Sequence, residues 1–332
     1  MKIIPDNRSL NEKAKDSEWY AWILLFYLLQ SDYPNQCLWE EFSHDIVYKN
    51  RFSSSSDVLK EILNKADDVE YIVPKGTLFF RARKYEKSPY EELIREFLKN
   101  NNTPEDETEK QLDQFRTVPD LFFRALFPDL YSVSKDFPLK TLHPIKAAFE
   151  NWENRQFKGF DADGSGAPSC GSIKAGRANP DFIRYLYLAE DADTACYEMR
   201  PIIGQYISVA TFQTTKDLKL YDLTRRFPAK FEDPKYEAPS LFDCISDHFS
   251  MPNADDPRKY IPTQFLTEKI KELGFDGIRF RSSLKENGVN VVVFQPESCE
   301  ALSSDLIQIG KISIGIQPFD PCRPNKGTEE IS

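Results

Sequence analysis

Histidine is scarce in this sequence of 332 residues, where only His44, His143 and His248 occur. None of the three lies at a metal-ligand spacing from another, so a catalytic metal held by histidines is not expected. Six cysteines are present, but they are widely scattered and include no CxxC pair. Reduced, buried thiols fit this pattern better than a disulfide framework or a zinc site. We therefore expect no metal, and a structural role for His143.

The sequence also lacks a long hydrophobic run. The longest one, WYAWILLFYLL at residues 19–29, is about half of what a membrane-spanning helix requires and predicts a buried or partner-facing helix. The first residues, MKIIPDNRSLNEK, show no apolar core followed by a small-residue cleavage site, so no secretory signal is predicted. These features predict a cytoplasmic protein that makes no membrane contact.

Positive charge is in deficit. The 43 Lys and Arg residues stand against 53 Asp and Glu residues, which gives a net charge of -10. Such a chain repels phosphate backbones, so general nucleic-acid binding is not expected, although a local basic pocket is compatible with this charge. With 40% hydrophobic residues the chain can bury a sizeable core, in one large domain with an appendage or in two modest domains.

The common motifs of nucleophilic and phosphate chemistry are missing. There is no GxSxG elbow, and no cysteine lies in a recognisable nucleophile context. The glycine-containing stretch GFDADGSGAP at residues 159–168 lacks the GKS or GKT ending of a phosphate-binding loop. It is interpreted as a turn or a flexible lid.

The hydrophobic pattern nevertheless predicts a definite order of elements. Residues 10–67 look helical, with DVLKEILNKADD following a serine cluster, and from Tyr71 a Pro-Lys-Gly turn separates two short strands. A helix is predicted in PYEELIREFLKN, and the charged stretch after it is predicted to be a solvated loop or helix surface.

The second half of the chain is clearer. A polar loop precedes the apolar strand IRYLYLA, an acidic turn, a helix beginning near Thr194 and the strand YISVATFQ. Pro262 and Gly274 mark the start and stop of a further helix, followed by strands at 277–280 and in NVVVF, the latter typical of a strand covered on both faces. The fold class predicted is α+β with a mixed sheet.

Four polar residues remain at the ends of these predicted elements, namely Arg81, Arg177, Glu198 and Ser282. Taken singly, each has an ordinary explanation. An arginine at a strand end usually forms a surface ion pair, a glutamate on a helix is usually solvated or paired, and a serine after a strand is usually a turn residue. Their chemistry gains meaning only when they are considered together.

Three stretches of the chain resemble the three blocks of the RES-domain family, in the family's order. They are LFFRAR at 78–83, GFD and GRANPDFIRYLYLAEDADTACYEMRP within 159–201, and GFDGIRFRSSLKENGVNVVVF at 274–294. The resemblance covers roughly residues 70–310. The family is named after an arginine, a glutamate and a serine, and these blocks place them at Arg81, Glu198 and Ser282.

The resemblance implies a fold similar to that of ADP-ribosyltransferases. It also implies a toxin of a toxin-antitoxin or phage-defence system that degrades NAD, as a glycohydrolase or phosphorylase, and that is restrained by an Xre-type helix-turn-helix antitoxin. NAD is then the substrate. Because nicotinamide is a good leaving group, no second cofactor is expected. Two alternatives stay open: an ADP-ribosyltransferase that modifies a macromolecule, and a non-catalytic nucleotide-binding module.

The residue types suit cleavage of the bond between nicotinamide and ribose. A carboxylate, Glu198, stabilises the oxocarbenium-like sugar and holds a ribose hydroxyl. Arg81 and Arg177 supply planar forks for the pyrophosphate. Ser282 is expected to contact the nicotinamide amide or a ribose oxygen, and Ser283 is its rival, because successive side chains of a strand point in opposite directions.

An aromatic wall for nicotinamide is expected from Tyr187 or Tyr85, and Arg200 is expected to hold Glu198 in place. Asp181, Phe182 and Arg184 stand where relatives commonly have a small, glycine-containing turn.

Domain boundaries follow from the same reasoning. Residues 1–69 form a helical segment likened to HEPN domains, residues 70–315 form the RES domain with an insertion at about 88–158, and residues 316–332 form a loose tail. No Arg-x4-6-His ribonuclease motif surrounds His44. The helical segment is therefore expected to bind a partner or to mediate self-association as a homo-oligomer.

Overall fold

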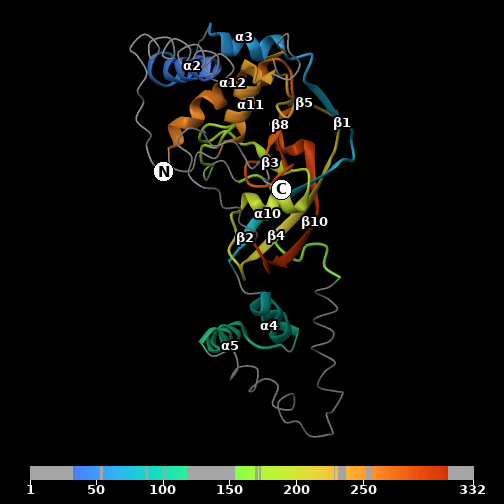
Figure 1. The fold of residues 1–332 in the computed structure, drawn as a ribbon. Coiled ribbons are helices and arrows are strands. Elements are labelled where there is room, and N and C mark those ends of the chain that lie inside the picture. Colours follow the sequence, from blue (N-terminus) through green and yellow to red (C-terminus); the bar gives the residue numbers. More distant parts are fainter. Residues whose placement is uncertain are drawn as a thin grey trace, which may run out of the picture.

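The computed structural model describes residues 33–52, 55–86, 89–100, 102–117, 154–168, 171, 173–227, 229–230, 237–251 and 256–312. The helix expected at residues 19–29, His143 and the tail at 316–332 lie outside these ranges. Figure 1 shows a twisted sheet with helices above it and a pair of helices, α4 and α5, below it.

The described part of the chain forms one sheet of eight strands, in the order β1-β5-β8-β9-β3-β2-β4-β10. Neighbouring strands are antiparallel except for β5 and β8, which are parallel. The prediction of an α+β fold with a mixed sheet is confirmed. The strands of the sheet are β1 (Glu70–Val73), β2 (Leu78–Tyr85), β3 (Leu186–Ala189), β4 (Tyr206–Thr214), β5 (Leu218–Asp222), β8 (Gly277–Arg281), β9 (Val289–Val293) and β10 (Cys299–Gln308).

The remaining elements are helices and one short ribbon, β6 (Ala229–Lys230) with β7 (Glu237–Ala238). The helices are α2 (Tyr33–His44), η1 (Asp45–Lys49), α3 (Asp57–Asn64), α4 (Pro89–Asn100), α5 (Glu105–Thr117), α9 (Ala162–Ser165), α10 (Ala192–Glu198), α11 (Leu241–Ser250), η3 (Pro257–Tyr260), α12 (Ile261–Glu272) and η4 (Pro296–Ser298).

Local sequence signals place several of these elements. α3 begins after Ser56, whose side chain accepts a hydrogen bond from the Leu59 amide at 3.3 Å. α12 has Pro262 in its first turn, and the chain leaves it through Gly274 at a φ of +85°. In β9 the last four residues are buried, as expected for a strand covered on both faces. The predictions for these three elements are confirmed.

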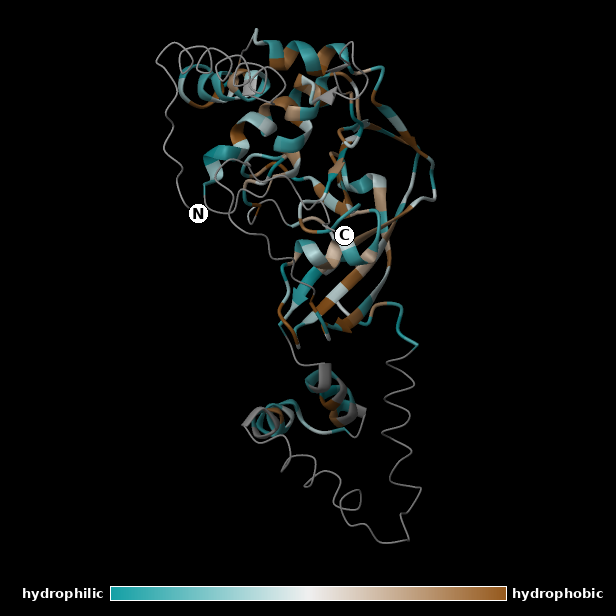
Figure 2. Cartoon of the chain, in the orientation of Figure 1, coloured by the Kyte–Doolittle hydropathy of each residue, from teal (hydrophilic) through white to brown (hydrophobic). Residues whose placement is uncertain are grey.

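The two faces of the sheet pack against different layers. Side chains such as Ile278 and Val292 belong to a core shared with α11 and α12, whereas Leu188 and Val291 belong to a core on the opposite face. Figure 2 shows the brown, apolar residues concentrated on the strands and on the inward sides of the helices. Period-two alternation of apolar residues along the strands supplies both cores.

The helices α2 and α3 pack on the same core as α11 and α12. Phe42 contacts Phe265 with ring centroids 6.0 Å apart, and the Tyr221 hydroxyl donates a hydrogen bond to the Ile62 carbonyl at 2.9 Å. His248 of α11 stacks on Trp39 of α2 at 4.2 Å. The described helices of the amino-terminal segment are thus joined to the sheet domain by a common core.

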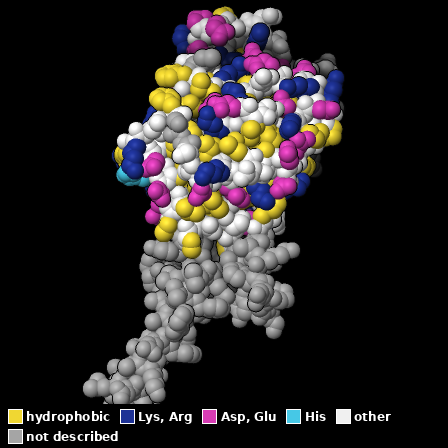
Figure 3. Space-filling model, turned by 90° about the horizontal axis from the view of Figure 1, so that it is seen from above, with side chains coloured by type: hydrophobic (Ala, Val, Ile, Leu, Met, Phe, Trp, Pro, Cys, Tyr) yellow, Lys and Arg dark blue, Asp and Glu magenta, His cyan; other side chains and the backbone are white. Residues whose placement is uncertain are grey.

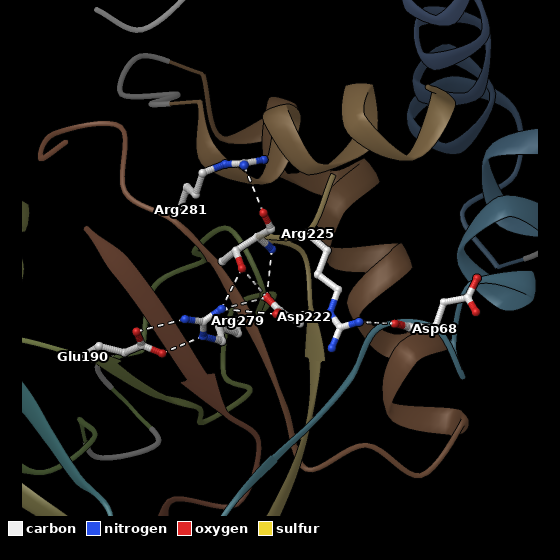
Figure 4. Close-up of polar contacts among 7 residues, drawn as sticks. Asp68, Glu190, Asp222, Arg225, Arg279 and Arg281 are labelled. Carbon is white, nitrogen blue, oxygen red and sulfur yellow. Dashed lines mark hydrogen bonds and ion pairs between the residues drawn. The ribbon is translucent and has the colours of Figure 1, made fainter. Parts of the chain in front are cut away.

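An ion-pair network holds the ends of the central strands together (Figure 4). Arg279 of β8 donates to Glu190 at 2.6 Å, to Asp222 of β5 at 3.1 Å and to the Thr224 hydroxyl at 2.6 Å. The Tyr71 ring lies 4.7 Å from its guanidinium carbon. Burial by itself lowers the pKa of Arg279, but the hydrogen bond to Glu190 and the charges of both carboxylates raise it.

On the upper face of the molecule, the two signs of charge are mixed. Figure 3 shows dark-blue and magenta side chains interspersed among apolar ones on the upper face. Among the described residues, no helix is both long enough and apolar enough to cross a membrane.

Candidate functional site

A cavity of about 600 Å³ opens where two neighbouring strands separate. β2 pairs with β4 along its whole length but with β3 at a single position, Phe80 opposite Ala189. The space beyond that position is closed by α10 and by the loop that precedes β3. The lining residues are Phe80, Arg81, Ala82, Arg83, Lys84, Pro168, Arg177, Tyr187, Leu188, Ala189, Ala195, Glu198, Met199, Tyr260, Phe280 and Asn290.

Glu198 is the carboxylate of this cavity. It is the last residue of α10, a helix that begins where the Asp191 side chain accepts a hydrogen bond from the Thr194 amide at 2.8 Å. Its Oε1 accepts two hydrogen bonds of 2.7 Å, one from the Ser282 hydroxyl and one from the Asn290 amide. Its Oε2 accepts none from the described residues. One oxygen is therefore fixed by the protein, and the other is available to a ligand.

Ser282 contacts Glu198 and does not line the cavity. Its backbone amide donates to the Gly288 carbonyl at 2.8 Å, and its hydroxyl accepts from the Leu284 amide at 3.1 Å while it donates to Glu198. Ser283 follows it in the bend after β8 and is exposed. The structure thus brings Ser282, and not Ser283, into hydrogen-bond contact with the carboxylate.

Asn290 is a site residue that the sequence analysis did not identify. It lies in β9, is 7% exposed, lines the cavity and holds the same carboxylate oxygen as Ser282. A signal was present, because an amide inside the continuous apolar run VNVVV has to be buried, and a buried amide requires hydrogen-bond partners.

Arg81 and Arg83 reach the cavity from β2. Alternation places Phe80 and Ala82 toward α10 and the two arginines toward the opposite side, where α9 lies. Arg81 donates to the carbonyls of Ser165, at 2.8 Å, and of Gly166, while Arg83 donates to the same Gly166 carbonyl at 2.6 Å.

The stretch expected to be a turn or lid therefore forms the short helix α9 and holds both guanidinium groups. Burial and the charge of Arg83 lower the pKa of Arg81.

Arg177 lies in the loop before β3 and reaches the end of α11. Its guanidinium donates to the carbonyls of Phe249 and of Met251, the latter at 2.7 Å, and its central carbon lies 5.3 Å from the Phe280 ring centroid. Burial lowers the pKa of Arg177, against the opposing effects of Tyr260 and Glu198. Its Nε is buried without a partner among the described residues.

The two predicted tyrosines lie in different places. Tyr187 lines the cavity, where its hydroxyl donates to Asn179 at 2.7 Å and accepts from the Ala178 amide at 3.0 Å. A Cβ at position 176 would lie 2.7 Å from that hydroxyl, which is why glycine stands there. Tyr85 is buried against Phe160 at 5.2 Å and is not a lining residue. Tyr187 is thus placed to contact a ligand, and Tyr85 is not.

Two residues next to the site have a left-handed backbone. Phe182 has a φ of 69°, which accounts for the glycine-containing turn expected here in relatives, and Arg200 has a φ of 45°. Arg200 is exposed and makes no ion pair with Glu198 in the described part of the chain. The prediction that Arg200 holds Glu198 is wrong, because Ser282 and Asn290 do so.

The charges of the cavity are unbalanced. Arg81, Arg83, Lys84 and Arg177 all line it, and none of them forms an ion pair with a carboxylate of the described residues. Glu198 is the single acidic residue among the described residues that line it. Within the same residues, no group of three or more His, Cys, Asp and Glu side chains is arranged to hold a metal ion. The arrangement suits an anionic ligand that brings its own negative charge.

Comparisons with known proteins can be set beside this geometry. A search of curated proteins finds no match. A solved structure, that of the M. tuberculosis MbcT-MbcA toxin-antitoxin complex, is similar at 17% sequence identity over 40% of this chain and 72% of that one, with a TM-score of 0.25. The RES domain model matches residues 143–310, which include Arg177, Glu198, Ser282 and Asn290 and leave Arg81 outside. Because this match spans just over half of the chain, the protein belongs to the RES domain family.

Proposed function

We propose that the chain is an NAD-degrading enzyme that cleaves the bond between nicotinamide and ribose. The observation that carries this proposal is the state of Glu198, whose Oε1 is held by Ser282 and Asn290 at 2.7 Å while its Oε2 accepts no hydrogen bond from described residues. A carboxylate fixed in this way is preorganised before the substrate arrives.

The chemistry follows from the charge that develops in the reaction. As the glycosidic C–N bond breaks, its electron pair goes to the nicotinamide nitrogen, and the ribose acquires oxocarbenium character. The Oε2 of Glu198 stabilises that positive charge and accepts a hydrogen bond from a ribose hydroxyl. In the hydrolytic reaction a water oxygen then bonds to the anomeric carbon and releases one proton.

The cationic side chains supply binding and orientation. Arg177 lies in the electrostatic field of Glu198 and is tied to carbonyls at the end of α11, so its position is fixed. The pyrophosphate of the dinucleotide offers anionic oxygens, which are better acceptors for a guanidinium than neutral carbonyls are. Tyr187 and Phe280 offer aromatic surface on the same cavity wall for the nicotinamide ring.

We also propose a biological role as the toxin of a toxin-antitoxin pair acting in the cytoplasm, with an Xre-type antitoxin as partner. Membership of the RES domain family supports this role through the resemblance described above. Expression of the chain should stop growth, and coexpression of a helix-turn-helix protein encoded beside it should restore growth.

The enzymatic proposal is tested with purified protein and NAD. Nicotinamide release should be abolished by Glu198→Gln, because the amide keeps the shape of the side chain and removes its charge. Glu297→Gln is the matched control, since Glu297 is 73% exposed and pairs with Arg184 on the surface. Full activity of Glu198→Gln would overturn the assignment.

The fate of the ribosyl group separates the alternatives. With NAD labelled in its ADP-ribose portion, free ADP-ribose indicates hydrolysis, and a phosphorylated product that forms only with added phosphate indicates phosphorolysis. Label retained on a protein or nucleic acid of a cell extract indicates transfer to a macromolecule instead.

A further inference from the structure

The cavity carries more positive charge than the dinucleotide NAD can neutralise. Among the described residues, four cationic side chains line it, those of Arg81, Arg83, Lys84 and Arg177, together with one carboxylate, Glu198. The excess is three positive charges, of which one is on Lys84, an exposed side chain, and two belong to partly buried groups, where like charges repel more strongly than in water. NAD brings about two negative charges on its pyrophosphate and one positive charge on its nicotinamide ring, so most of the excess remains.

The excess is concentrated at one place, on β2. Arg81 and Arg83 both donate to the Gly166 carbonyl, so their guanidinium groups lie side by side. Burial lowers the pKa of both arginines, and the charge of Arg83 lowers the pKa of Arg81 further. Among the described residues, their only acceptors are the neutral carbonyls of Ser165 and Gly166. Two adjacent guanidinium groups without a carboxylate form a binding site for a doubly charged anion.

We propose that Arg81 and Arg83 form a subsite for a phosphate monoester, and that the enzyme cleaves the 2′-phosphorylated dinucleotide, NADP, in addition to NAD. This inference rests on the proposed function. NADP carries about three net negative charges, two more than NAD, which matches the excess of the cavity. Arginine is also the side chain by which dinucleotide-binding proteins accommodate a 2′-phosphate. The pyrophosphate is left to Arg177, which is held by other carbonyls, at the end of α11.

A comparison of the kcat/KM values for NADP and NAD tests the subsite. The wild-type protein should cleave NADP with a kcat/KM at least equal to that for NAD. Arg83→Gln should lower the ratio of kcat/KM for NADP to kcat/KM for NAD by about tenfold or more, which is the loss expected for one charge-assisted hydrogen bond. Arg184→Gln is the control, because Arg184 is an arginine on the surface, 40% exposed and outside the cavity. It should leave the ratio unchanged.

A binding measurement separates this inference from the proposed function. Because of its 2′-phosphate, 2′-phospho-ADP-ribose should raise the melting temperature of the wild-type protein more than ADP-ribose does. Arg83→Gln should remove that difference. If neither dinucleotide is cleaved but the difference is found, the proposed function is refuted and the subsite stands. If NAD is cleaved but NADP is at least tenfold poorer, or if Arg83→Gln leaves the ratio unchanged, the subsite is refuted.

Discussion

Replacing Arg279 by methionine should destabilise the fold through the carboxylates that it leaves behind. Asp222 has a side chain only 5% exposed, and Arg279 donates to it at 3.1 Å. Removing one partner of a buried ion pair costs about 3–5 kcal/mol, because the remaining charge stays desolvated. Methionine has a similar length, so the loss is electrostatic and leaves little cavity.

The surroundings of Asp222 place the expected loss of unfolding free energy near the lower limit of this range. The backbone amide and hydroxyl of Thr224 still donate to its Oδ1, at 2.9 and 2.6 Å, and Glu190, at 31% exposure, can be solvated by water. We therefore expect Arg279→Met to lower the free energy of unfolding by about 3 kcal/mol.

The assay is equilibrium unfolding in urea at neutral pH, with the slope m compared between variants so that the shift in midpoint reports stability. Arg225→Met is the matched control. Arg225 is 46% exposed and lies 3.7 Å from the same Asp222, so its loss should cost less than about 1 kcal/mol. Adding Asp222→Asn to Arg279→Met should recover part of the loss. A cost of Arg279→Met within about 1 kcal/mol of the control would refute this reasoning.

Two further predictions concern the site and the helical interface. Asn290→Ala removes one of the two donors to Glu198, so kcat for nicotinamide release should fall about tenfold or more with a smaller change in KM, and an unchanged kcat would contradict the role of Asn290. Burial lowers the pKa of His248 from 6.5 to about 4, so this residue is neutral in the folded protein. As the pH falls, His248 is protonated in the unfolded chain before it is protonated in the folded protein. The stability that the neutral His248 contributes is therefore lost as the pH falls from 6.5 toward 4. His248→Phe, which still stacks on Trp39, should flatten the dependence of the urea midpoint on pH over that range, and an unaltered dependence would contradict it.

Local patterns in the sequence predicted the elements whose signals lie within a few residues. α4, α12 and β9 match their predicted ranges closely, because helical spacing, capping residues and continuous apolar runs are local properties. Other elements were missed. α11 begins with a capping box of Ser240 and Asp243, and β5 and β10 are strands whose pairing partners are distant in sequence.

The residues of the candidate site also fall into two groups, those predicted from local sequence and those found only in the structure. The sequence by itself predicted Arg177, Glu198 and Ser282 as site residues, since the residue types and their family blocks are local, and the structure places all three at or beside the cavity. The placement of Arg83 and Asn290 depended on which strands lie side by side. β2 joins β3 at one pair only, and β9 lies beside β3, so residues about 90 positions apart in the chain meet at Glu198.

The sequence thus determined which polar side chains are available to the candidate site, whereas the tertiary structure decided what each side chain contacts. Ser282 was expected to contact the substrate, yet its hydroxyl donates to Glu198, because β8 and β9 bring it beside the end of α10. Tyr187 and Tyr85 are equivalent as aromatic residues, and only the separation of β2 from β3 places one in the cavity and the other in the core. Strand pairing between distant segments leaves no local pattern in the sequence, and that pairing built the cavity.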